Sequence, residues 1–391
     1  MRVGRWTPDS MSVMRVRVMM SQDAIEHHWR QLFAAAWRSI LQSESLKRLP
    51  PNLKVRFSRR IDARQCARIE WNGNVRIVIS TKFAVELHRE LAELAPTLVG
   101  LAFASTKARR KRCLEAVCTI EDLAVSFILF HEIFHLMGGH LDWTSQQRGL
   151  AQFDEQKLWL AFSTRSPERS SKRFGRTDLS TSYVLESEAD CNAIQWLLQY
   201  AELSGLRQLL RSKGQPVIEW APEKRQTAFR LALAAVWLVI RKLESLRASW
   251  LQPRGTTHPL PVTRVFMAFG TFLREYSSIS DLEYDEAGGG QRRLTGKDVT
   301  SMREFLLHAM GPVLKADWSP GKETVPPNSL EGQMRIYFPD FANHMLNREV
   351  KTRVGRQILQ MERARFRMDR TLRPFRFFPI AELRRRERSE S

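Results

Sequence analysis

The sequence predicts an α+β protein that is mostly helical and carries one small antiparallel sheet. Two observations predict this class. Several long stretches repeat apolar residues at helical spacing, whereas short β-rich runs occur mainly between residues 53 and 80. The chain has 391 residues, of which 43% are hydrophobic, so it can bury a sizeable core.

The N-terminal part predicts one helix followed by the strands of the sheet. Residues 23–43 place their apolar side chains on one side of a helix. Residues 53–59 have the pattern of a short strand. Within residues 66–80, the runs ARIEW and VRIVIS are joined at Asn72-Gly73, the dipeptide favoured in two-residue hairpin turns. We therefore expect an antiparallel hairpin here.

Helices dominate the region after the hairpin. A helix over residues 82–94 is expected to end before Pro96. Thr119 and Asp122 resemble a capping box, which predicts that a second helix begins there and ends at Gly138-Gly139. The remaining predicted helices cover residues 182–203, 222–250 and 262–276.

We expect three parts in the chain. Residues 1–50 form an N-terminal helical segment, residues 51–280 a central domain, and residues 281–391 a basic helical C-terminal region. The second boundary lies where acidic residues, three consecutive glycines and a basic pair follow one another. No internal repeat is present in the sequence.

The chain is strongly basic, with a formal net charge of +20. Such a charge is typical of proteins that bind nucleic acid or another anionic partner. The basic residues are spread along the chain, which favours a solvated basic surface instead. A nucleic-acid partner is therefore the less favoured interpretation.

Cysteine usage and hydropathy indicate a soluble, cytoplasmic protein. The four cysteines form no CxxC pair and are too few for a disulfide framework. The longest apolar run, residues 231–240, has ten residues, whereas a bilayer span needs about 20. We therefore expect a buried helix at this run and no membrane span.

One motif carries recognisable chemistry: His131-Glu132-x-x-His135 within an apolar, helix-compatible stretch. Residues four apart lie on one face of a helix, so His131 and His135 can direct their imidazoles at one metal ion. Glu132 lies beside them, where it can act as the base for a metal-activated water. This is the pattern of a zinc hydrolase.

A third ligand is needed, because catalytic zinc sites use three protein ligands and leave one position for water. The predicted helix over residues 182–203 offers Glu186 and Asp190, which are four apart and share a face. We predict that Glu186 binds the metal and that Asp190 orients a ligating imidazole. Glu188 is the alternative ligand, although it falls on a different face. His140 either orients the site or caps the end of its helix.

Together these motifs resemble those of the gluzincin metallopeptidases, in particular the HtpX and CAAX-prenyl-protease type. Those families also have a His-Pro followed by an Arg six residues after the His, and this chain has His258-Pro259 and Arg264. The resemblance covers residues 68–273. It implies a zincin-like catalytic core with the sheet beside the zinc-binding helices. It further implies that His258 stabilises the oxyanion and that Arg264 holds His258 or the substrate.

The expected lack of membrane helices separates this chain from that membrane-embedded type. The Lit-type phage-exclusion peptidases and the ImmA/IrrE-type peptidases are soluble and share parts of the pattern. We therefore expect a soluble zinc endopeptidase with a protein or peptide substrate, in which the strand at residues 75–80 forms a sheet edge that aligns the peptide. The alternative is a basic, nucleic-acid-associated regulator whose metal site is structural or vestigial.

Overall fold

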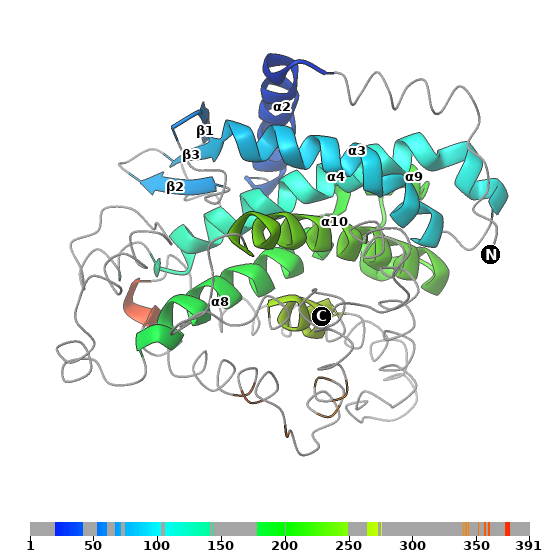
Figure 1. Ribbon diagram of the computed structural model, residues 1–391. Coiled ribbons are helices and arrows are strands. Elements are labelled where there is room, and N and C mark those ends of the chain that lie inside the picture. The colour runs from blue at the N-terminus through cyan, green and yellow to red at the C-terminus, as the bar shows by residue number, and fades with distance from the viewer. Residues whose placement is uncertain are drawn as a thin grey trace, which may run out of the picture.

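The computed structural model of the chain is shown in Figure 1. It describes residues 20–41, 53–60, 67–71, 75–102, 106–140, 143, 178–199, 201–248, 264–272 and 275. Further along, it describes residues 339, 341, 343, 351, 356, 359 and 372–375. All structural statements below concern these residues.

The described part is mostly helical, as predicted. Its longer helices are α2 (Gln22–Ile40), α3 (Thr81–Ala102), α4 (Thr106–Met137), α8 (Asp178–Gln199) and α10 (Pro222–Ala248). Residues 264–272 are also helical. The short elements are η3 (Ala201–Ser204), α9 (Leu206–Leu209), η4 (Val217–Glu219) and η7 (Arg373–Phe375). Helix α4 contacts α2, α3, α8 and α10, so it is the central helix of the assembly (Figure 1).

Helix α2 agrees closely with its sequence pattern. Ser21 caps its N-terminus, with the side-chain oxygen accepting a hydrogen bond from the Ala24 backbone N–H at 3.3 Å. The predicted apolar side of the helix is buried against α3 and α4. The buried residues are Ile25, Trp29, Phe33, Ala36, Trp37 and Ile40.

The sheet has three strands in the order β1-β3-β2: β1 (Leu53–Ser58), β2 (Ala67–Trp71) and β3 (Val75–Ser80). Strands β2 and β3 pair antiparallel, with Ile69 opposite Ile77. Strand β1 pairs parallel with β3, with Val55 opposite Ile77. The predicted antiparallel pairing of the runs ARIEW and VRIVIS is therefore confirmed, whereas the prediction of a wholly antiparallel sheet is wrong, because β1 joins β3 in parallel.

Strand β3 lies at the centre of the sheet, so the prediction that it forms an edge is also wrong. Its consecutive residues Ile77, Val78 and Ile79 are all buried, which shows that both of its faces are covered. A continuous apolar run is typical of such a doubly covered strand. Strands β1 and β2, each with one described neighbour, hold the outer positions, and β2 packs against α4.

The ten-residue apolar run of α10 is buried throughout, as predicted. Its residues belong to one hydrophobic cluster that also includes residues of α2, α3, α4 and α8. Among the described helices, none is long and apolar enough to cross a membrane.

A buried polar cluster joins α2, α3 and α4. The Glu121 carboxylate of α4 contacts His88 Nδ1 of α3 at 2.6 Å and accepts a hydrogen bond from Trp29 Nε1 of α2 at 3.3 Å. All three residues are almost fully buried, so each partner satisfies a polar group that would otherwise be costly to bury.

Two predicted helix ends are wrong. Helix α4 begins at Thr106 and not at Thr119, whose hydroxyl donates to the Glu115 carbonyl at 2.8 Å instead of capping a helix. Helix α3 continues through Pro96 to Ala102. In both cases packing against neighbouring helices outweighs the local signal.

The division into parts 1–50, 51–280 and 281–391 stays a prediction, because most of the last part lies outside the described residues. Described residues of that part contribute to the core, among them Phe341 and Leu372. Phe341 stacks on Phe266 with the ring centroids 4.8 Å apart and the planes at 9°, and both rings are buried. Residue 341 thus belongs to the same hydrophobic cluster as the helical residues 264–272.

Candidate metal centre

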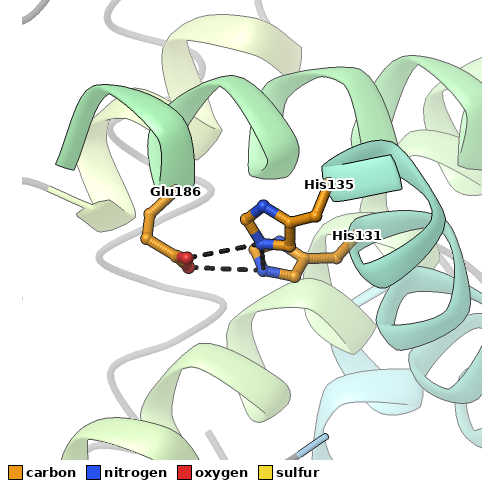
Figure 2. Close-up of side chains that lie close together, drawn as sticks. All are labelled: His131, His135 and Glu186. Carbon is orange, nitrogen blue, oxygen red and sulfur yellow. Dashed lines mark hydrogen bonds and ion pairs between the residues drawn. The ribbon is translucent and has the colours of Figure 1, made fainter. Parts of the chain in front are cut away.

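The C-terminal end of α4 carries His131, Glu132 and His135, and α8 packs along this helix. Figure 2 shows Glu186 of α8 pointing at the imidazoles of His131 and His135. Large apolar side chains of α4, including Phe130 and Phe134, pack edge-on against Trp196 of α8 and hold the two helices together. The predicted i, i+4 pair of histidines and the predicted glutamate are therefore brought to one place.

The three side chains converge closely. His131 Nε2 and His135 Nε2 lie 3.0 Å apart. Glu186 Oε2 is 3.3 Å from His131 Nε2, and Glu186 Oε1 is 3.3 Å from His135 Nε2. Among the described residues, these three side chains form the one group of histidines, cysteines or carboxylates close enough together to hold a metal ion.

The trio fits a metal ion. Zinc bonds of about 2.0–2.1 Å in a tetrahedral site place neighbouring ligand atoms roughly 3.3 Å apart, which is close to the separations seen here. Both carboxylate oxygens of Glu186 are buried and have no hydrogen bond from the described residues. A buried carboxylate needs a cationic partner; in the metal-free protein the protonated His131 at 3.3 Å supplies one, and a bound metal ion would replace it.

Asp190 lies one turn after Glu186 on α8 and contacts the far side of the first ligand. Its Oδ1 atom is 2.9 Å from His131 Nδ1. Arg264 donates to the same carboxylate from Nε at 2.6 Å and from Nη2 at 2.9 Å. Arg264 Nη2 is also 3.8 Å from Glu186 Oε2. The chain His131–Asp190–Arg264 thus fixes the ring of the first ligand.

In the metal-free protein the pKa of His131 is raised, whereas the pKa of His135 is lowered. Burial lowers the pKa of His131, but the carboxylates of Asp190 and Glu186 outweigh it and raise the pKa to about 10. Burial, together with the charges of His131 and His140, lowers the pKa of His135 to about 3, against the opposing effect of Glu186. A proton on His131 therefore takes the place of part of the metal's charge.

The carboxylates of Glu186 and Asp190 stay ionised. Burial raises the pKa of Glu186, but His135 and His131 outweigh it and hold the pKa well below its usual range. Burial likewise raises the pKa of Asp190, whereas Arg264 and His131 bring it down to about 2. Ionised carboxylates are what metal binding and imidazole orientation require.

Glu132 is also buried, but its carboxylate is not one of the three converging side chains. Burial raises its pKa to about 7, opposed by the charge of His131 and by a hydrogen bond from the backbone of Ile69 in β2. A pKa near neutral pH suits a general base. The contact also shows that the outer strand β2 passes next to this carboxylate.

His140 lies beside His135, which is the contact that its predicted orienting role requires, and that role stays a prediction. Its Nδ1 atom lies 2.8 Å from His135 Nδ1, and its Nε2 atom lies 3.3 Å from Glu188 Oε2. Glu188 is therefore a partner of His140, whereas Glu186 is the residue beside both ligand nitrogens. Sequence reasoning missed this role of Glu188, for which the only signal was its place two residues after Glu186.

The other predicted site residues are placed as follows. Arg264 contacts Asp190 and Glu186 and is therefore part of the site. Its two hydrogen bonds there both go to the carboxylate of Asp190, which contacts His131. His258, assigned to the oxyanion by resemblance, lies outside the described residues. The role of Arg264 toward His258 or a substrate stays a prediction.

Comparisons with models of known protein families, with curated proteins and with solved structures found no match for this chain.

Proposed function

We propose that this chain is a zinc-dependent endopeptidase with a zincin-like catalytic core. The observation that carries the proposal is the buried trio His131, His135 and Glu186 with Glu132 beside it. Two imidazoles and one carboxylate are the ligand set of many zinc hydrolases. The trio has three described members, which would leave a position for water, whereas structural zinc sites use four protein ligands.

Each residue then has a defined task in hydrolysis. A bound zinc ion polarises a carbonyl group and lowers the pKa of water towards neutrality. Glu132 takes the proton of the attacking water and passes it to the leaving amine. Its pKa of about 7 in the metal-free protein allows it to do both near neutral pH. Asp190 and Arg264 keep the His131 ring in place during this sequence.

A peptide is the substrate that the surroundings of Glu132 favour. Strand β2 has β3 on one side and packs against α4, and the Ile69 backbone contacts Glu132. An extended peptide can pair with the backbone of such an outer strand, which would bring one of its carbonyl groups near the base. The sequence resemblance to gluzincin peptidases points to the same substrate class.

The test compares the wild-type chain with Glu132→Gln, whose side-chain oxygen can still accept the hydrogen bond from Ile69. Protein termini are mapped across the proteome of cells that express either version. We expect new termini in the wild type that are absent with Glu132→Gln, and equal zinc content in the two purified proteins. Identical sets of termini would contradict the proposed activity, and full peptidase activity of the variant would contradict the base assignment.

A further inference from the structure

A second chain of contacts leads away from the metal centre. His135 Nδ1 faces His140 Nδ1 at 2.8 Å, and His140 Nε2 faces Glu188 Oε2 at 3.3 Å. All three side chains are buried. We infer that His140 and Glu188 are positioning residues that set the tautomer of His135, with Glu188 as the acceptor for His140. This inference rests on the proposed metal site and specifies what holds its second ligand.

The direction of the hydrogen bonds follows from Glu188. An ionised carboxylate only accepts, so the His140 nitrogen beside it must carry the proton. When the His140 ring carries this one proton, its other nitrogen is an acceptor, and it takes the Nδ1–H of His135. His135 Nε2 is left with a free electron pair, which is the form that binds a metal.

The contacts around His135 Nε2 suit a metal ligand. His131 Nε2 lies 3.0 Å away and Glu186 Oε1 lies 3.3 Å away. With its proton on Nδ1, His135 directs an electron pair towards these two atoms, where one metal ion could be held.

The glycine pair after α4 makes the relay possible. A side chain at Gly138 would place its Cβ 2.8 Å from the Phe134 carbonyl oxygen and 2.9 Å from His140 Nε2. Gly139 has a φ of 75°, in the left-handed region that favours glycine. These two residues turn the chain so sharply that His140 returns to a position beside His135.

Asp190 and Glu188 lie on different faces of helix α8, and each acts on a different histidine. Side chains two apart on a helix point about 200° apart, so Glu188 cannot share the face of Glu186 and Asp190. Asp190 contacts His131 directly, whereas Glu188 reaches His135 only through His140. The turn after α4 bridges this difference in direction.

The first test measures zinc affinity by competition with a chelating dye. Glu188→Leu removes the acceptor, and we expect it to weaken zinc binding about 10- to 100-fold, as loss of an outer-shell partner typically does. Gly138→Ala displaces His140 and should have a similar effect. Glu188→Gln retains an acceptor oxygen and should bind close to wild-type strength. Ser187→Ala, a neighbouring buried change, is the matched control.

The second test reads the tautomer itself, from 15N chemical shifts of the histidine rings in the metal-free protein at neutral pH. His135 is neutral there, since its pKa is about 3. We expect the proton on Nδ1 in the wild type and Glu188→Gln, and a mixture of tautomers in Glu188→Leu. A proton on Nε2 in the wild type, or equal tautomers and zinc affinities in all variants, would overturn the inference.

The two tests separate this inference from the proposed function. If the wild-type chain bound no zinc, the proposed function would fail, while the ring shifts of the metal-free protein would still decide the relay. If it bound zinc and Glu188→Leu bound it equally well, the relay alone would be wrong.

Discussion

Zinc binding should be coupled to release of the proton on His131. The structure places this imidazole between Asp190 Oδ1 at 2.9 Å and Glu186 Oε2 at 3.3 Å, and the pKa is raised to about 10. A metal needs the Nε2 electron pair, so the ring must lose one proton before it can bind. Above pH 8, Glu132 has already lost its own proton, because its pKa is about 7.

The magnitude follows from the pKa. At pH 8, which is about two units below the pKa of His131, removing this proton weakens zinc binding by about 3 kcal/mol. Zinc binding therefore strengthens as the pH rises towards 10. Zinc affinity should therefore increase about tenfold from pH 8 to pH 9 through His131.

The assay is competition with a chelating dye at pH 8 and pH 9, for the wild type and Asp190→Asn. The variant removes the negative charge beside Nδ1, so its His131 has a lower pKa and its zinc affinity should change less with pH. Ionisation of a zinc-bound water is common to both proteins and cancels in the comparison. Equal pH dependences of the wild type and the variant would refute this reasoning.

Three further predictions concern zinc binding, packing and acid stability. Arg264→Leu should weaken zinc binding, because Asp190 loses its two donated hydrogen bonds, and Arg264→Lys should recover part of the loss; titration with zinc checks both. Phe130→Ala should lower the free energy of unfolding by about 3–5 kcal/mol in chemical denaturation, because the ring is fully buried against Trp196. The metal-free protein should lose stability below pH 4.5, because His135 is protonated in the unfolded chain but stays neutral in the native state until the pH reaches its native pKa of about 3. This residue accounts for about 2 kcal/mol of lost stability between pH 4.5 and 3. His135→Gln should therefore be less acid-sensitive over that range. Between pH 7 and 4.5 the raised pKa of Glu132 offsets this loss, because the native state then binds the proton first.

The parts of the site that depend on one helix were predictable from the sequence. His131 and His135 share a face because they are four residues apart, and the same holds for Glu186 and Asp190. Once α4 and α8 pack together, these two spacings bring all four side chains to one level. The burial of the ten-residue run in α10 was predictable for a similar reason, since it has no polar face.

The parts that depend on how separate segments meet were not predictable. Glu188 reaches His140 only because Gly138 and Gly139 turn the chain after α4, and no local pattern states where that turn directs the ring. The order of the strands depends on which strands pair with β3, and the pattern of each strand leaves that open. The start of α4 was missed because threonine is a residue type favoured at helix N-caps, yet the Thr119 hydroxyl donates a hydrogen bond to a carbonyl within the helix.

Metal content is the most direct measurement of the central claim. The wild-type chain, Glu186→Ala and the matched control Ser187→Ala are purified in the presence of zinc, dialysed and analysed for bound metal. We predict about one zinc per chain in the wild type and the control, and almost none in Glu186→Ala. Stoichiometric zinc in Glu186→Ala, or a wild-type chain without zinc, would contradict a metal centre made of His131, His135 and Glu186.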